Sequence, residues 1–286
     1  MANDGCCASE TPLAGRPQAA RRQGRPWWGW RARVTPSGDE PPRGIDGVLF
    51  DYGETLVEFS RPRAALAEAE QQILALVAAS GRPAPSLTTL RAIIDRVDRD
   101  VAEHQRSGAL EEMDLAASAL HAYADAGLGL DDALLDDVLR VEQEAWWQGA
   151  HLDRDAIPLL ESLRAVGMRV GLCSNAPYRV LSLHAQLAFL GLDRYLDSVT
   201  FSAEVGWRKP SPRIFEAAMR ALGTGAARTV MVGDSEAADI AGAHAAGLRA
   251  VLVSRGGDDG SSEADAVIAA LRDLPGALRN MGIYLG

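Results

Sequence analysis

Polar side chains in this sequence stand at the ends of several short apolar runs, where a buried strand would stop. They are Asp51 after GVLF, Ser174 and Asn175 after VGLC, Lys209 after SVTFSAEVGWR, and Asp234 after TVMVG, with Asp239 five residues later. A single aspartate at such a position is usually a turn former or a helix cap. Several such positions in one parallel sheet would meet at its carboxyl edge, where ligands bind. The pattern therefore predicts a compact polar site.

Lys209 is the only lysine among the 29 basic residues, and all the others are arginines. Lysine presents a compact point charge on a flexible stem, whereas arginine presents a wide planar fork. A small site that must neutralise an anion beside a nucleophile would favour the compact charge. We therefore expect Lys209 to belong to the site.

The elements that would position these residues follow an alternating pattern of strands and helices. Short apolar, β-branched runs predict strands at 45–51, 168–175, 198–202, 228–234, 248–254 and 264–268. Helical spacing fills most intervals between them, as at 155–167 and 212–223, and each of these two helices ends at a glycine that can cap it. This alternation is typical of an α/β fold with a doubly wound, Rossmann-like parallel sheet.

One interval breaks the alternation. Between the first and second strands, residues 59–167 contain no convincing strand and instead read as helices, at 65–80, 87–104, 114–127 and 134–147. A helical insertion directly after the first strand would sit above the carboxyl end of that strand. We therefore expect a core domain of residues 44–58 and 153–286, with residues 59–152 inserted as a helical cap.

Composition restricts the class of protein. The 286 residues carry a net charge of −10, which disfavours nucleic acid as the main partner. We expect no membrane span, because no run of about 18 apolar residues occurs. The three cysteines are too few and too oddly placed for a disulfide framework, so a reducing cytoplasm fits best. Residues 1–43, rich in Arg, Gly, Pro and Ala, are expected to form a disordered extension, with an Arg/Trp anchor for a partner or membrane surface as the alternative.

Taken together, the motifs resemble a known family. The order D-x-x-x-T at the first strand, S-N at the second, K-P after the third and G-D-S-x-x-x-x-D at the fourth is similar to the four motifs of the haloacid dehalogenase superfamily of hydrolases. The resemblance covers residues 45–275, and a helical insertion after the first motif is similar to the subgroup with a helical cap. It implies a hydrolase, with a phosphatase as the first expectation.

The resemblance also implies roles for individual residues. Asp51 would be the nucleophile, forming an aspartyl-phosphate intermediate that water hydrolyses. Ser174 would bind the phosphoryl oxygens and Lys209 would offset their charge, while Asn175 and Thr55 would contact the substrate. The expected cofactor is Mg²⁺, which prefers oxygen ligands; its ligands would be Asp51, the backbone carbonyl of Gly53, Asp234 and Asp239. The expected substrate is a small phosphorylated metabolite.

The sequence departs from this family at Gly53. Phosphatases of the superfamily normally carry a second aspartate there, which protonates the leaving oxygen and later activates water. Such an acid or base contributes roughly 10²- to 10⁴-fold in rate. Glu54 is a possible substitute, but successive side chains near a strand end point in different directions. An efficient phosphatase would need another proton donor or an acidic leaving group.

Three alternatives stay open at this point. Haloacid dehalogenases need no metal and generally carry an aromatic residue at the position of Gly53. Relatives that cleave phosphonates use a cap lysine, which this sequence lacks. Loss of the acid could also mark a protein that binds a phosphorylated ligand or partner without turnover. Asp234 and Asp239 argue against the metal-independent dehalogenase, and retention of Lys209 and Asp234 argues against a protein without turnover. A metal-dependent phosphatase is therefore favoured over all three.

Overall fold

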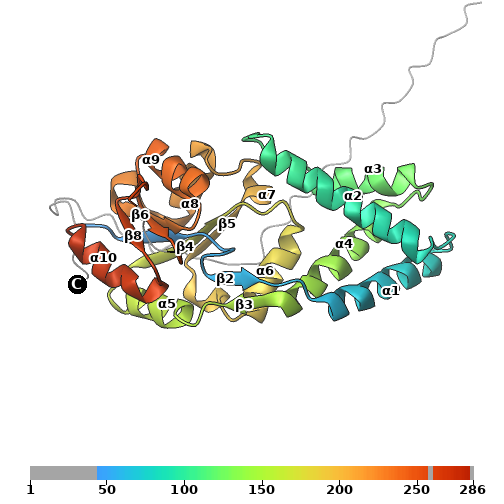
Figure 1. The fold of residues 1–286 in the computed structure, drawn as a ribbon, viewed down its shortest axis with the longest axis horizontal. Coiled ribbons are helices and arrows are strands. Elements are labelled where there is room, and N and C mark those ends of the chain that lie inside the picture. Colours follow the sequence, from blue (N-terminus) through green and yellow to red (C-terminus); the bar gives the residue numbers. More distant parts are fainter. Residues whose placement is uncertain (1–43, 257–259, 284–286) are drawn as a thin grey trace, which may run out of the picture. The chain divides into compact units, whose positions relative to one another are not determined.

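A six-stranded parallel sheet forms the centre of the computed structural model, which describes residues 44–256 and 260–283 (Figure 1). Its strand order is β5-β4-β1-β6-β7-β8. The strands are β1 (Gly47–Phe50), β4 (Arg169–Ser174), β5 (Ser198–Phe201), β6 (Thr229–Gly233), β7 (Arg249–Val253) and β8 (Ala266–Ile268). All six predicted strands are confirmed, each within a few residues at either end. The expected extension at residues 1–43 lies outside the described residues.

The central strands β1, β4 and β6 are buried on both faces, which explains their continuous apolar runs. Along β1, Val48 and Phe50 join one hydrophobic cluster, whereas Leu49 between them joins another. Helices α5 and α10 cover the first face, and α8 and α9 cover the second (Figure 1). The prediction of a doubly wound α/β fold is therefore confirmed.

The helices around the sheet also agree with the predicted intervals. They are α5 (Ala156–Ala165), α6 (Val180–Phe189), α7 (Ser202–Val205), α8 (Pro212–Leu222), α9 (Gly242–Ala245) and α10 (Leu274–Asn280). Short helical turns complete the connections, at η1 (Trp147–Gly149), η2 (Asp193–Tyr195), η3 (Ala226–Arg228), η4 (Glu236–Ala241) and η5 (Leu271–Asp273).

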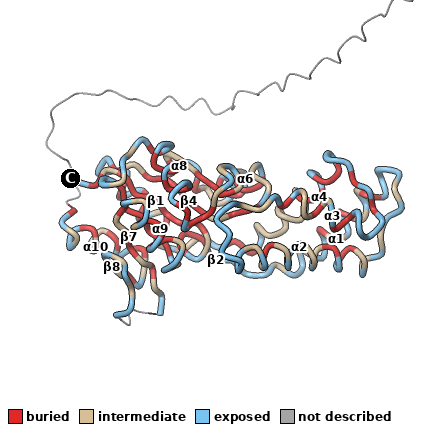
Figure 2. Tube along the Cα trace, turned by 90° about the horizontal axis from the view of Figure 1, so that it is seen from above, coloured by how far each residue is buried: buried red, intermediate tan, exposed pale blue. Residues whose placement is uncertain are grey.

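Four further helices follow β1 in the chain: α1 (Arg63–Ala79), α2 (Leu87–Arg106), α3 (Leu115–Asp125) and α4 (Asp132–Trp146). The side chains of Ser86, Asp114 and Asp131 accept hydrogen bonds from backbone N–H groups in the first turns of α2, α3 and α4, and so fix where these helices begin. The four helices share their own hydrophobic cluster, separate from those beside the sheet (Figure 2). This separation supports our proposal that they form a cap domain within residues 59–152.

The expectation that residues 59–167 contain no strand was wrong at one point. A two-stranded antiparallel ribbon pairs β2 (Val57–Phe59) with β3 (Ala150–Leu152), where the chain enters and leaves the helical insertion. Strands of three residues are too short to show a period of two in the sequence. The ribbon holds the two ends of the insertion together beside the first strand of the core.

Candidate active site

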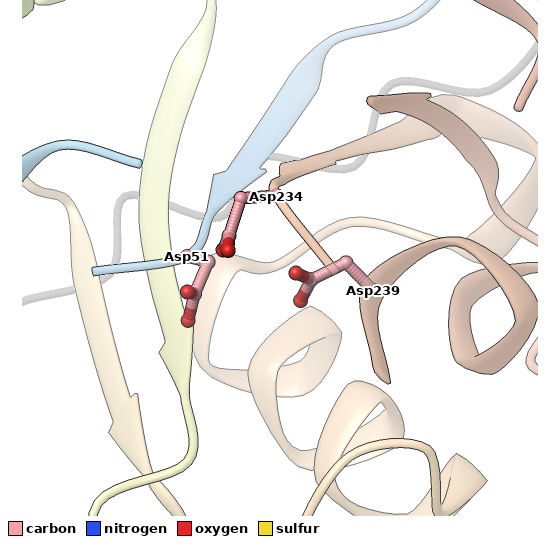
Figure 3. Close-up of side chains that lie close together, drawn as sticks. All are labelled: Asp51, Asp234 and Asp239. Carbon is pink, nitrogen blue, oxygen red and sulfur yellow. The ribbon is translucent and has the colours of Figure 1, made fainter. Parts of the chain in front are cut away.

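Three carboxylates meet at the carboxyl edge of the sheet. Asp51 follows β1, Asp234 follows β6, and Asp239 lies in η4 (Figure 3). One carboxylate oxygen from each lies within 4.8 Å of the others. β1 and β6 are neighbours in register, with Phe50 opposite Val232, so the residues that follow them meet. The sequence placed these acids at strand ends, and the parallel register brings them together.

Gly233 makes room for Asp239. A Cβ atom on Gly233 would lie 2.2 Å from Cγ of Asp239, so any other residue would displace that carboxylate. Asp239 Oδ2 accepts a hydrogen bond from the backbone N–H of Ser235 at 3.0 Å. The Ser235 hydroxyl in turn accepts from the N–H of Ala238 at 3.2 Å and caps η4. The turn after β6 thus holds Asp239 against the end of the strand.

Lys209 connects two of the three acids. Its buried Nζ donates to Asp51 Oδ1 at 2.6 Å and to Asp239 Oδ1 at 2.5 Å. Burial alone would lower the pKa of this ammonium, but the charges of Asp239 and Asp51 outweigh burial and raise its pKa. Lys209 therefore stays charged at neutral pH.

Asn175 fixes the backbone of Lys209. The N–H of Lys209 donates to Asn175 Oδ1 at 2.7 Å, and Asn175 Nδ2 donates to the carbonyl of Lys209 at 3.0 Å. Both polar atoms of the Asn175 side chain are therefore used within the protein. The geometry shows that Asn175 positions Lys209. Asn175 also lines the cavity, and the substrate contact that the resemblance implied for it stays a prediction.

The charges of this cluster do not balance. Burial raises the pKa of Asp239 to about 6, although the Lys209 ammonium lowers it, and burial together with the Asp51 charge raises the pKa of Asp234. With one ammonium among three carboxylates, full ionisation leaves an excess negative charge. A divalent cation would offset that excess, and carboxylate oxygens are the ligands that Mg²⁺ prefers. The donor set therefore fits the expected Mg²⁺.

Two hydroxyl groups, of Ser174 and Thr55, also lie at the carboxyl edge of the sheet. Ser174, at the end of β4, is buried and lines a cavity together with Gly53 and Asn175. The fully buried hydroxyl of Thr55 donates to Asp234 Oδ1 at 3.3 Å. Thr55 thus orients one of the acids, and the substrate contact that the resemblance implied for it stays a prediction.

Glu54 lies away from these residues. It is exposed in a turn with a positive φ of 57°, and it does not line the cavity beside Gly53. Its N–H donates to the carbonyl of Val57 at 2.7 Å, and its carbonyl accepts a hydrogen bond from the guanidinium of Arg255. The geometry gives no support to Glu54 as the substitute acid.

The cavity at this edge has a volume of about 350 Å³ and reaches from the core to the inserted helices. Aromatic side chains line much of it, namely Tyr52, Phe59, Trp146, Trp147 and Tyr178. Asp98 of α2 and Glu142 of α4 also line it, and sequence reasoning missed both. A signal for Glu142 existed: it follows Val138 and Leu139 on α4 at the spacing of the buried face, where a carboxylate is unusual.

The family model for haloacid dehalogenase-like hydrolases matches residues 45–247. The chain belongs to this family. The match covers the predicted motifs from Asp51 to Asp239.

Individual relatives of this hydrolase include several phosphatases. A glyceraldehyde 3-phosphate phosphatase of Methanopyrus kandleri is 29% identical over 74% of this chain and 85% of its own length. A second one, of Methanothermobacter thermautotrophicus, is 41% identical over 33% of this chain, and the chain spans 41% of that relative. Among solved structures, a 2-haloacid dehalogenase of Pseudomonas syringae is 28% identical, covers 82% of this chain with 99% of its own, and has a TM-score of 0.62.

The inserted helices of this hydrolase contact the core close to Lys209. The N–H of Glu112 donates to the carbonyl of Gly206 at 3.0 Å, and the N–H of Arg208 donates to the carbonyl of Leu110 at 2.8 Å. The side chains of Glu112 and Arg208 form a buried ion pair at 3.9 Å. The segment that precedes Lys209 therefore packs against the loop between α2 and α3.

Arg179 makes a second contact between core and insertion. Its guanidinium donates to both carboxylate oxygens of Asp136 on α4, at 2.6 and 2.8 Å, and its N–H donates to Gln143 at 3.1 Å.

Among the helices that the structure describes, none is long and apolar enough to cross a lipid bilayer.

Proposed function

We propose that this hydrolase is a Mg²⁺-dependent phosphatase that acts on a small phosphorylated metabolite through Asp51. The observation that carries the proposal is the contact of Asp51 with Lys209 beside Asp234 and Asp239, at the edge of a cavity that can hold an organic group. Relatives named as phosphatases support it. Because the sequence contains only three cysteines, we propose a reducing cytoplasm as the location of the protein.

The residues divide the reaction into two displacements. A carboxylate oxygen of Asp51 would attack phosphorus, and the bond between phosphorus and the ester oxygen would break, which releases the alcohol. Water would then attack the phosphorus of the aspartyl phosphate, which frees inorganic phosphate and restores the carboxylate. Lys209 and the Ser174 hydroxyl would stabilise the charge on the phosphoryl oxygens through both steps.

Mg²⁺ would be held by the carboxylates of Asp51, Asp234 and Asp239 together with the carbonyl of Gly53. When bound, it would neutralise the charge of the phosphoryl group next to that of Asp51. Thr55 would keep Asp234 oriented toward it.

The leaving alcohol would depart with little help from the protein. Position 53 has no side chain, and the exposed Glu54 is not among the residues that line the cavity. We therefore expect this phosphatase to favour esters of acidic alcohols and phenols, which leave without a proton donor.

A second candidate function is that of a 2-haloacid dehalogenase. It is favoured by the similarity to the Pseudomonas syringae enzyme and by the apolar lining of the cavity. In that reaction Asp51 would displace halide from carbon. A haloacid carries a carboxylate, however, and the cavity already contains Asp98 and Glu142. Phosphoryl transfer remains the better fit.

A screen of the purified protein against phosphorylated metabolites and 2-haloacids, with Mg²⁺ and with chelator, separates the candidates. We expect phosphate release that requires Mg²⁺. Halide release that persists in chelator would instead establish the dehalogenase. Absence of turnover with every compound would favour a protein that binds a phosphorylated ligand without hydrolysing it.

A further inference from the structure

The side chains that line the cavity would discriminate between ligands by their charge. Apolar and aromatic side chains surround it, among them Phe59, Leu139 and Trp146. The described residues that line it include no lysine, arginine or histidine, whereas two are carboxylates, Asp98 and Glu142. An organic group that carries a second phosphate or a carboxylate would find repulsion there and no cationic partner.

Glu142 has no partner among the residues that the structure describes. No hydrogen bond or ion pair joins its carboxylate to another described side chain. Glu142 lies on the side of α4 that lines the cavity. Burial, with a contribution from Asp98, raises the pKa of Glu142 to about 7. A carboxylate in such surroundings costs free energy until a donor or a cation meets it.

Two arginines lie near this part of α4 but outside the main cavity. Arg61 lines an adjoining cavity of about 30 Å³ together with Asp98 and Glu142, and its guanidinium lies 6.0 Å from the ring centroid of Trp146. Burial raises the pKa of Asp98, and the charge of Arg61 acts in the opposite direction. Arg179 is held by Asp136. Neither guanidinium lines the main cavity.

The aromatic residues near Glu142 would also favour a cation. Trp146 lies one helical turn beyond Glu142 on α4, and Tyr178 lines the same cavity. Tyr178 is 43% exposed; partial burial, followed by the charges of Asp98 and Glu142, raises the pKa of its phenol. Aromatic faces attract ammonium groups, and more strongly where water is excluded.

We propose that the organic part of the substrate is an apolar or aromatic group that bears an ammonium, and that Glu142, assisted by Asp98, recognises this cation. The proposal rests on the proposed phosphatase function for the position of the phosphate, which would lie at Asp51 while the cation lies in the cavity. It names Glu142 as the residue that determines specificity.

The test compares three benzylphosphonates, which resemble the phosphate ester but cannot be hydrolysed. They carry a 4-aminomethyl, a 4-methyl or a 4-carboxy group and so present a cation, a neutral group or an anion. Calorimetric titration of the full chain with Mg²⁺ measures the three dissociation constants. We expect the aminomethyl compound to bind about tenfold or more tightly than the methyl compound, and the carboxy compound to bind most weakly.

Two variants show whether Glu142 is responsible. In Glu142→Gln the preference for the cation should fall to about twofold or less, while binding of the methyl compound is retained. The matched control is Glu144→Gln, because Glu144 lies on the same helix, pairs with Arg140 at 3.1 Å and does not line the cavity. It should keep the preference of the unaltered protein.

The outcomes separate this proposal from the proposed function. Equal binding of the three compounds, a preference for the anion, no measurable binding of the aminomethyl compound, or a preference that survives in Glu142→Gln would each overturn it. Turnover of the corresponding 4-substituted phenyl phosphates is measured in parallel. A cation preference in binding, lost in Glu142→Gln, with no hydrolysis of any phenyl phosphate, would uphold the recognition by Glu142 and reject the phosphatase.

Discussion

Gly53 leaves the turn after β1 without a side chain two residues beyond Asp51. Space is available there, because a Cβ atom would lie 3.6 Å from the nearest atom of Phe59, an ordinary contact. The backbone of Gly53 lies outside the positive-φ region that disfavours other residues. The fold therefore accommodates a Cβ atom at position 53, and we expect the lack of an acid there to affect the chemistry and not the fold.

Restoring the acid should help poor leaving groups most. We expect Gly53→Asp to raise kcat for an alkyl phosphate by roughly 10- to 100-fold, with little change for a nitrophenyl phosphate, because only the alkoxide needs a proton. Gly53→Asn is the matched control, since it has the same size without an ionisable proton. An equal gain in the asparagine variant, or no gain in the aspartate variant, would contradict this account of position 53.

Glu142 should make stability depend on pH. Its pKa is raised from 4.5 to about 7 by burial and by Asp98, so the folded state favours the protonated form, and that stabilisation is lost as the pH rises from 4.5 through 7. Glu142→Gln removes this loss. Urea unfolding measures the free energy of unfolding of both proteins at pH 5 and at pH 8. Relative to the unaltered protein, the value for the variant should rise by on the order of 1 kcal/mol between these two pH values. A difference that stays constant with pH would refute the shift.

At the scale of elements, the loop between α2 and α3 is tied to the segment that precedes Lys209. Both Glu112 and Arg208 have buried side chains, and two backbone hydrogen bonds flank their ion pair. Removing the Glu112 charge would leave the buried guanidinium of Arg208 without an ionic partner among the described residues, with a hydrogen bond to the carbonyl of His104 at 3.4 Å.

Glu112→Gln should therefore lower the free energy of unfolding by about 2 to 4 kcal/mol. Glu111→Gln changes the exposed neighbouring residue and should stay within about 0.5 kcal/mol of the unaltered protein. Thermal or urea unfolding of both variants checks the prediction. Equal stability of the two would show that the ion pair contributes nothing.

The elements differ in how far the sequence could predict them. The central core strands were predictable because burial on both faces demands continuous apolar runs, and the register of β1 and β6 then brings Asp51 and Asp234 together. The ribbon of β2 and β3 was not, because three residues show no period. Nor could the sequence show that the side chain of Asn175 would form hydrogen bonds with the backbone of Lys209, since these bonds depend on two loops meeting.

For the molecule as a whole, the site places an excess of negative charge at the carboxyl edge of the sheet. Three acids share one ammonium, so Mg²⁺ should bind the folded state and not the unfolded chain. At about 100 times its dissociation constant Mg²⁺ should stabilise the protein by about 2.7 kcal/mol, which raises Tm by several degrees. Asp234→Asn should lose most of this rise. An equal rise in that variant would place the metal elsewhere.

The central claim is that Asp51 is the nucleophile of a metal-dependent phosphoryl transfer. Phosphate release from a nitrophenyl phosphate, with Mg²⁺ and with chelator, tests it in the unaltered protein and in Asp51→Asn. The matched control is Asp46→Asn, because Asp46 precedes β1 at its opposite end and pairs with Arg169 and Arg228.

We expect turnover that requires Mg²⁺, persists in Asp46→Asn and falls at least about 10³-fold in Asp51→Asn, since a carboxamide cannot form the covalent intermediate. Phosphate release by Asp51→Asn at the rate of the unaltered protein would contradict it.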